Sequence, residues 1–183
     1  VIRLNRLQKQ LERYACDAVT ANSKIFFEET NPAYIEISDD LTFLDNKKEF
    51  IWTSTRDGFN HIYLYNLTGQ LVKQITAGSW DVTEFYGYDE VSGTYYFQAA
   101  LKSPMEKQVL AINAKGKQRI ISTESGTNKA AFSKNFKYYF ITNSALDRPY
   151  STTLYSINGK PVRLLNDNSG VTVTIRARAR TRR

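Results

Sequence analysis

Short runs of aromatic and β-branched residues recur along the chain, and a polar turn leads into each run. Side chains of these types favour strands. The runs repeat at a nearly constant distance, since Phe50 and Tyr95 lie 45 residues apart and Tyr95 and Tyr138 lie 43 apart. The pattern therefore predicts equivalent strands in successive repeats. The turns and the strands that follow them are 45–48 before 49–52, 91–94 before 95–97, and 135–137 before 138–140.

A second pattern follows each of these strands and predicts a hairpin. Each copy has a strand, a tight turn with a glycine, and another strand. The turn glycines Gly69, Gly116 and Gly159 are 47 and 43 residues apart, and Asn22 stands 47 residues before Gly69 in a fainter copy. Glycine and then asparagine are the residues that best accept a positive φ in a turn. The predicted hairpins cover 14–27, 61–76, 109–122 and 153–165.

A period of 43–47 residues with about four short strands is typical of a β-propeller blade. The sequence therefore predicts an all-β fold, a propeller fragment of three to four blades, each a four-stranded antiparallel sheet, over residues 1–168. One blade cannot cover both of its own faces, so the aromatic residues should pack between neighbouring sheets. The side chains expected to be largely buried there are Phe50, Trp52, Tyr95, Phe97, Tyr138 and Phe140.

The first residues allow two interpretations. Leu4, Leu7 and Leu11 have helical spacing among charged residues, which favours a short amphipathic helix. The repeat instead places residues 11–17 in a strand, and we prefer that interpretation, leaving 1–9 open. A fragment of this kind also has two terminal faces that no further blade covers. We expect both faces to be aromatic and to drive self-association, either face to face between terminal blades or by strand exchange at the open edges.

Composition and charge narrow the function classes. The chain has 183 residues, 42% of them hydrophobic and 23% charged, as in an ordinary globular domain. No apolar run is long enough to span a membrane, and the first residues do not resemble a signal peptide. The formal net charge of +7 comes mainly from five arginines in 169–183, since the rest carries 20 basic and 18 acidic side chains.

The Arg-rich tail, 169–183, is the only charge-based candidate for a function. It could contact nucleic acid phosphates, but it has no aromatic residues interleaved for stacking on bases. A product of truncation, a frameshift or cloning explains it better, and we expect a flexible tail. We therefore predict no nucleic acid partner.

Several segments of the repeats have a distinctive sequence: 4–8 (LNRLQ), 27–32 (FEETNP), 52–65 (WTSTRDGFNHIYLY), 74–82 (QITAGSWDV), 131–133 with 138–139, and 164–168 (LLNDN). Together they resemble the propeller of the dipeptidyl peptidase IV family, particularly its bacterial, Bacteroides-like members. The resemblance runs in order over about residues 3–168.

The resemblance implies an eight-bladed propeller over a C-terminal α/β-hydrolase domain, which removes dipeptides with proline in second position. It implies a periplasmic, cell-envelope or secreted parent, peptide substrates and a homo-oligomer. The family's nucleophile elbow, G-x-S-x-G, is absent from these 183 residues. The chain alone should therefore be inactive, and we assign it no catalytic, cofactor or metal residues. The alternative is a stand-alone propeller that binds a protein or a small ligand.

Other residues with reactive or binding side chains have simpler structural explanations. His61 begins a strand and Cys16 lies in one, so we expect a structural histidine and a buried cysteine. We expect Trp80 to pack between blades, and the alternative is an aromatic side chain that stacks on a ligand. The look-alike pair Glu28-Glu29 does not match the family's substrate-binding glutamates, which belong to an earlier segment.

The acidic pairs Asp39-Asp40 and Asp89-Glu90 are expected to be solvated turn residues. Neither pair has the D-x-D-x-D spacing that supplies oxygen ligands for calcium. One cysteine and one histidine also exclude a disulfide within the chain and a Cys- or His-based metal cluster. Asn66-Leu67-Thr68 fits the glycosylation sequon in a hairpin turn, which has no meaning in a bacterial protein.

Overall fold

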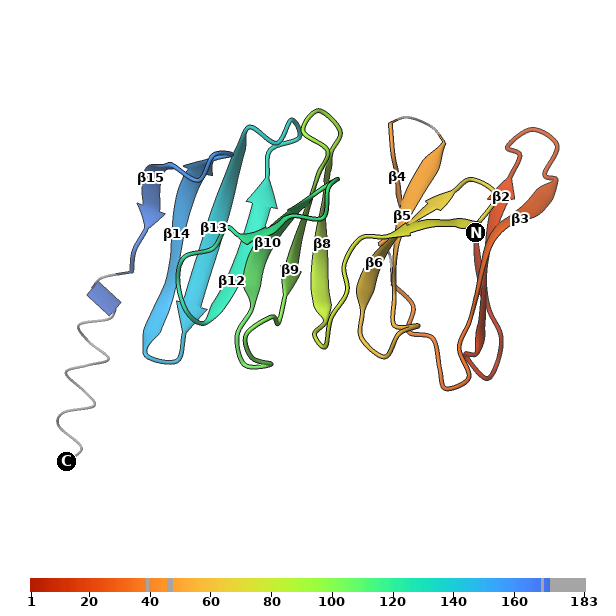
Figure 1. Ribbon diagram of the computed structural model, residues 1–183, viewed down its shortest axis with the longest axis horizontal. Helices are drawn as coiled ribbons and strands as arrows, with labels where there is room; N and C mark the ends of the chain where they lie inside the picture. Colours follow the sequence, from red (N-terminus) through yellow and green to blue (C-terminus); the bar gives the residue numbers. More distant parts are fainter. Residues whose placement is uncertain (39, 46–47, 169, 172–183) are drawn as a thin grey trace. The chain divides into compact units, whose positions relative to one another are not determined.

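The computed structural model describes residues 1–38, 40–45, 48–168 and 170–171. The described residues form fifteen strands in four antiparallel sheets (Figure 1). The chain divides into two compact units, Val1–Val82 and Thr83–Arg183. The repeated strands and the all-β fold predicted from the sequence are confirmed.

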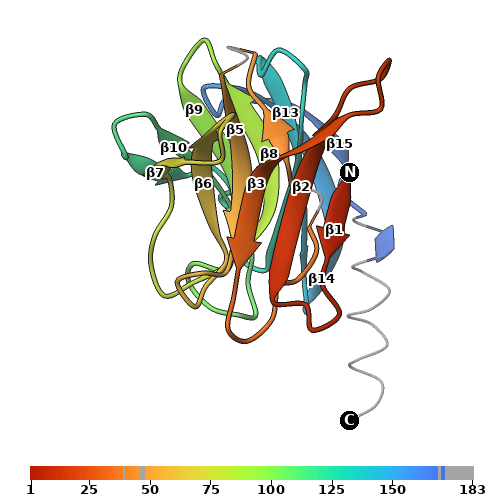
Figure 2. The same ribbon diagram turned by 90° about the vertical axis from the view of Figure 1, so that its right-hand side faces the viewer.

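The first sheet of unit 1 has three strands, in the order β1-β2-β3 (Figure 2). Leu4 pairs with Leu11 across β1 and β2, and both side chains lie on the inner face. The spacing of Leu4 and Leu11, which favoured a helix in the sequence, thus arises from the hairpin, because residues opposite each other in a hairpin share one face of the sheet. Residues 1–9, for which the sequence analysis assigned no structure, therefore include the strand β1. The bounds are β1 (Ile2–Leu4), β2 (Gln10–Cys16) and β3 (Ser23–Thr30).

The second sheet of unit 1 packs on this inner face. The core between the two sheets contains an aromatic cluster in which the Phe27 ring lies 4.9 Å from Tyr65 and 5.6 Å from both Phe50 and Trp52. Edge-to-face contacts of this kind add to the stabilisation from area burial. The strands, in the order β4-β5-β6-β7, are β4 (Thr42–Phe43), β5 (Glu49–Ser54), β6 (His61–Asn66) and β7 (Leu71–Gln74).

Unit 2 repeats the arrangement with two four-stranded sheets. Tyr96 and Val109 of one sheet share a core with Tyr139 and Ile141 of the other. The first sheet contains β8 (Val82–Asp89), β9 (Thr94–Ala99), β10 (Gln108–Asn113) and β11 (Gln118–Ile120). The second contains β12 (Thr127–Phe132), β13 (Tyr138–Ala145), β14 (Arg148–Ser156) and β15 (Pro161–Asn166).

The hairpin turns follow the prediction at the glycines but not at asparagine. Gly69, Gly116 and Gly159 have φ values of 77°, 82° and 85°. At Gly69 a Cβ would also lie only 2.5 Å from the Phe26 carbonyl oxygen, so a larger residue would clash with backbone. In the first hairpin Ala21, with φ of 58°, takes the positive-φ position instead of Asn22. Asp17 makes this possible, because its side chain accepts bonds from Val19 N and Thr20 N and fixes the turn.

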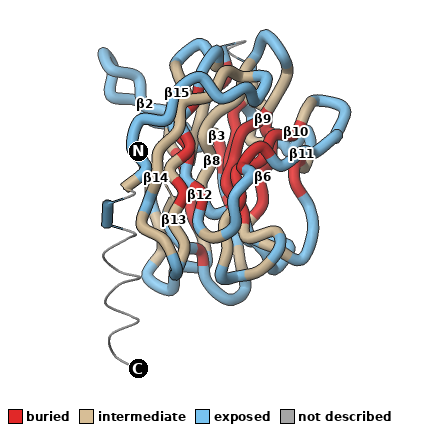
Figure 3. Tube along the Cα trace, turned by 90° about the vertical axis from the view of Figure 1, so that its left-hand side faces the viewer, coloured by how far each residue is buried: buried red, intermediate tan, exposed pale blue. Residues whose placement is uncertain are grey.

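The burial prediction holds for four of the six aromatic residues. Phe50, Trp52, Tyr95 and Phe97 are at most 5% exposed, whereas Tyr138 is 49% and Phe140 40% exposed. The prediction for this last pair is wrong, because β13 turns Tyr139 towards the neighbouring sheet and its two neighbours the other way. In the described part of unit 2 no other sheet covers that side, and β15 is exposed along its length (Figure 3).

Two surfaces are used below. The N-terminal free face is the side of β1–β3 that points away from the core of unit 1. It contains Arg3, Gln10, Glu12, Tyr14 and Glu28. The C-terminal free face is the side of β12–β15 that points away from the core of unit 2, and it contains Ala131, Tyr138, Phe140, Leu154 and Arg163.

Candidate functional site

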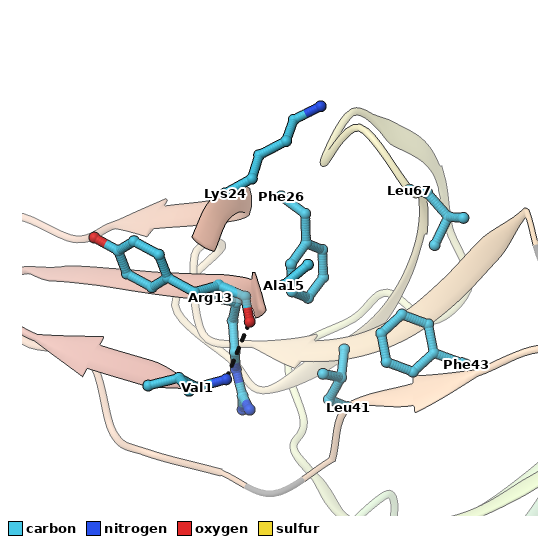
Figure 4. A pocket seen from close by; sticks show the side chains of 9 residues that line it. Val1, Arg13, Ala15, Lys24, Phe26, Leu41, Phe43 and Leu67 are labelled. Atoms are coloured by element: carbon cyan, nitrogen blue, oxygen red, sulfur yellow. Dashed lines mark hydrogen bonds between the residues drawn. The ribbon is translucent and has the colours of Figure 1, made fainter. Parts of the chain in front are cut away.

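A cavity of about 480 Å³ opens between the two sheets of unit 1. Its walls come from segments far apart in the sequence. Phe26, Leu41, Phe43 and Leu67 surround one open space, which Ala15 also borders (Figure 4). A volume of this size is within the usual range for small-molecule sites, which are mostly apolar.

A β-bulge brings Phe26 to this cavity. The pairing of β2 with β3 shifts between Arg13 and Tyr14, so Arg13 pairs with Phe27 and Tyr14 with Ile25. Phe26 is the extra residue, and its ring reaches Phe43 at 6.0 Å and Phe50 at 5.6 Å. The bulge thus turns two successive phenylalanines, Phe26 and Phe27, towards the core side of one strand.

The charges around the cavity are all positive. Its nine lining residues include Lys24 and Arg13, and none of the nine is acidic. Arg13 is buried, donates from Nη2 to the Ser38 carbonyl at 2.9 Å, and lies 4.6 Å from the centre of the Trp52 ring. Lys24 is exposed, and its side chain extends at the upper edge of the view in Figure 4. The cavity therefore combines an apolar interior with a cationic surround.

The Glu28-Glu29 pair is divided between the two faces of β3. Glu28 lies on the N-terminal free face, and Glu29 is buried in the core of unit 1. The Glu29 carboxylate accepts a bond from Trp52 Nε1 at 2.6 Å and another from Ser54 Oγ, and Arg56 Nη2 lies 3.7 Å from its Oε1. These partners satisfy a buried charge from within the chain, which is the structural role that such a group requires.

Arg56 joins this cluster to two tyrosines of β6. Its guanidinium carbon lies 4.9 Å from the centre of the Tyr63 ring and 5.5 Å from that of Tyr65. Burial raises the pKa of Tyr65 to about 12, and the positive charge of Arg56 opposes that rise. The pKa of Tyr63 is also raised, first by burial and then by its hydrogen bond to Asp57. Both phenols therefore stay neutral well above physiological pH.

His61 is held by hydrogen bonds at both ring nitrogens. Nδ1 lies 3.2 Å from Thr76 Oγ1, and Nε2 lies 3.0 Å from the Gly78 carbonyl oxygen. The imidazole is 1% exposed, and the Trp80 ring packs edge-on against it at 5.1 Å. Trp80, in the loop after β7, thus packs on a histidine of β6 in unit 1. His61 fits the structural role expected of it.

The lone cysteine differs from the prediction. Cys16 is exposed, because it is the last residue of β2 and lies where the hairpin leaves the sheet. Asp89 behaves as the expected turn residue, whereas Asp40 differs from the expectation, because it is half-buried and bonded to β5. Asp89 accepts bonds from Val91 N and Ser92 Oγ, and Asp40 accepts one from Thr53 Oγ1 at 2.6 Å, while Asp39 lies outside the described residues.

No group of three or more His, Cys, Asp or Glu side chains suited to a metal ion occurs among the described residues. In the sequon, Asn66 Oδ1 accepts bonds from Thr68 N and Thr68 Oγ1 and from Gln70 N, which is the pattern of an Asx turn. The Arg-rich tail lies outside the described residues, Gly170 and Val171 excepted. Within the part of the chain that is described, no helix is long and apolar enough to cross a membrane.

Comparison with known proteins identifies the family. The model of the dipeptidyl peptidase IV N-terminal region matches residues 1–150. The chain belongs to this family. The resemblance found in the sequence is thereby confirmed, over most of the length that it was expected to cover.

A solved structure and curated relatives agree with this assignment. The crystal structure of Porphyromonas gingivalis dipeptidyl peptidase 4 superposes with a TM-score of 0.89 at 37% identity, over 97% of this chain and 25% of that one. A relative from Aspergillus clavatus, named "Probable dipeptidyl peptidase 4", is 25% identical over 91% of this chain and 23% of its own length. The dipeptidyl peptidase 4 of Arthroderma otae is 25% identical over 70% of this chain and 17% of its own length.

These comparisons confirm that the four sheets belong to a propeller domain of the dipeptidyl peptidase IV type. The chain spans about a quarter or less of the length of these relatives. Neither the cavity nor the Glu29 cluster was found from the sequence. The one available signal for Glu29 was an acid at an inward position of a strand that also carries Phe27, whereas the cavity depends on long-range contacts.

Proposed function

We propose that this chain forms part of the propeller of a serine dipeptidyl peptidase that removes X-Pro dipeptides from peptide N-termini. In this role it cleaves no bond itself. The membership of the family supports the proposal, and so does the chemistry of the site residues. His61 is buried with both ring nitrogens engaged, which leaves it unsuited to act as a general base.

The observation that carries the proposal is the C-terminal free face. Tyr138 and Phe140 are about half exposed there, beside Leu154 on the next strand. Apolar sheet faces of this kind are normally covered. A further blade would bury this face in the same way that Tyr139 is buried on the opposite face. The sheet thus has the surface expected where a propeller continues.

In the parent protein this propeller would restrict access of peptides to an α/β-hydrolase domain of the same chain and contribute surface to a homodimer. A periplasmic, cell-envelope or secreted location follows from the same family resemblance. Catalysis would depend on a nucleophile elbow beyond the 183 residues, where a serine, an acid and a histidine act together.

The test compares this chain with the product of the complete reading frame. We expect the 183-residue chain to leave Gly-Pro-p-nitroanilide uncleaved. The complete product should hydrolyse it and lose activity after reaction with a serine-directed fluorophosphonate. Turnover by the short chain that disappears in His61→Ala, or a complete product that neither hydrolyses the substrate nor reacts with the probe, would overturn the proposal.

The second candidate is a stand-alone propeller that binds a small ligand, and the cavity in unit 1 is the observation that favours it. The second candidate requires that the complete reading frame contains no G-x-S-x-G segment followed by aspartate and histidine. The same fluorophosphonate experiment therefore separates the two candidates.

A further inference from the structure

We propose that the cavity between the two sheets of unit 1 binds a single-chain apolar carboxylate, with the acyl chain among Phe26, Leu41 and Phe43 and the carboxylate near Lys24. Nothing in the proposed peptidase function requires such a ligand.

The interior of the cavity sets the apolar part of the ligand. Phe26, Leu41, Phe43 and Leu67 present aromatic and aliphatic surface to the same space. Phe43 is 55% and Leu67 43% exposed, so both keep surface that a bound chain can cover. The cavity has a volume of about 480 Å³ and is open to solvent, and this volume is within the usual range for small-molecule sites.

The charge around the cavity sets the head group. With Lys24 and Arg13 among its lining residues and no carboxylate among them, the site favours an anion over a cation. Arg13 is already engaged with the Ser38 carbonyl and the Trp52 ring, so it would favour a bound anion through its positive charge and not through a direct hydrogen bond. Lys24 is exposed and can move to meet an anionic group. A carboxylate on an apolar chain satisfies both features.

Decanoate is the probe, with decanol and decyltrimethylammonium as neutral and cationic ligands of equal chain length. Titration calorimetry on the 183-residue chain, below the micelle concentration, should show one decanoate per chain. The affinity should exceed that for decanol about tenfold, and the cation should bind more weakly still. Shortening to octanoate should cost about fourfold per methylene removed.

Two substitutions locate the site. Ala15 shares the inner face of β2 with Leu11 and Arg13, and it borders the cavity, so Ala15→Trp should fill the space and abolish binding. Lys24→Glu should weaken decanoate binding about tenfold while leaving decanol almost unchanged. Two control substitutions lie at exposed positions of unit 2. These are Lys160→Glu in another hairpin and Val162→Glu in β15, and neither should alter decanoate binding.

Amide chemical shifts provide a measurement on the unsubstituted chain, in case Ala15→Trp fails to fold. Decanoate should move the signals of Ala15, Lys24 and Phe43, and leave those of Tyr138 and Phe140 in place. Shifts confined to Tyr138 and Phe140, equal affinity for decanoate and decanol, or no saturable binding at all would each overturn the proposal.

Discussion

One cross-strand row on the N-terminal free face contains Arg3, Glu12 and Glu28, whereas a row on the C-terminal free face contains Ala131, Phe140, Leu154 and Arg163. The two sheets have similar inner faces, each with buried aromatic side chains against a neighbouring sheet. They differ in what they present on the other side.

The polar face is satisfied within its own sheet. Gln10 Nε2 donates to Glu28 Oε1 at 2.8 Å, Tyr14 donates to Glu12 Oε2 at 2.6 Å, and Arg3 lies 3.5 Å from the same Glu12 oxygen. The apolar face has Thr142 and Thr152 hydroxyls bonded to each other at 3.0 Å, next to exposed aromatic rings. Water can solvate the first face at little cost, but it cannot do so for the second.

The comparison corrects the expectation that both terminal faces are aromatic. The N-terminal free face lacks that character, because Tyr14 is bonded to Glu12 there and the outward positions near the middle of the sheet, Gln10, Glu12 and Glu28, are polar. Aromatic runs in a propeller sequence therefore show that a strand is packed on at least one side. They do not show that both sides are covered. Self-association should therefore use the C-terminal free face.

The largest expected effect separates inner from free faces. Phe50→Ala removes a fully buried ring and should lower the free energy of unfolding by about 3–5 kcal/mol. Phe140→Ala removes a ring that is 40% exposed, and should cost less than about 1 kcal/mol. Urea denaturation followed by circular dichroism measures both. At a concentration where the chain is monomeric, equal losses would contradict this difference between the inner and the free face.

The next prediction uses two adjacent glutamates. Glu29→Ala leaves the Trp52 N–H and the Ser54 hydroxyl without their buried acceptor, and should destabilise the chain by about 3 kcal/mol. Glu28→Ala loses one exposed bond from Gln10 and should cost at most about 0.5 kcal/mol. The same denaturation experiment gives both values. A small loss for Glu29→Ala would show that water replaces the carboxylate in the core.

Association tests the two free faces directly. We expect the chain to self-associate at micromolar concentrations. The double substitution Tyr138→Lys with Phe140→Lys should raise the dissociation constant by at least about tenfold, because buried charge opposes apolar contact. The matched pair, Gln10→Lys with Thr30→Lys, adds the same two positive charges to the N-terminal free face, where Gln10 and Thr30 pair across β2 and β3. Sedimentation equilibrium should show no change for this pair. The reverse result would assign association to the polar face.

The smallest effect is a dependence on alkaline pH. Burial raises the pKa of Tyr65 to about 12, above the value of about 10 in an unfolded chain. Between these values the unfolded state releases protons that the folded state keeps, so stability is full below pH 10 and falls as pH rises towards 12. Urea midpoints at pH 8, 10 and 11.5 measure the decline. Tyr65→Phe, which cannot ionise, should make it shallower, and an unchanged slope would contradict the assignment.

Much of the fold was determined locally and could be predicted from the sequence. The repeat of strand runs gave the sheets, because alternation and aromatic content act over a few residues. Glycines at 69, 116 and 159 marked three turns, since a positive φ is a property of the turn itself. The first hairpin was harder, because the side chain of Asp17 allows Ala21 to take the position expected for Asn22.

The tertiary structure alone decided which face of each strand is covered. Tyr138, Tyr139 and Phe140 are similar as a sequence, yet only Tyr139 meets a neighbouring sheet. Glu28 and Glu29 are identical in type, and the pleat of β3 sends one to solvent and the other to Trp52. The cavity needs Ala15, Phe43 and Leu67 on its walls, and the chain brings these residues together only when two sheets pack. Such contacts depend on partners far away in the sequence, so local sequence patterns do not predict them.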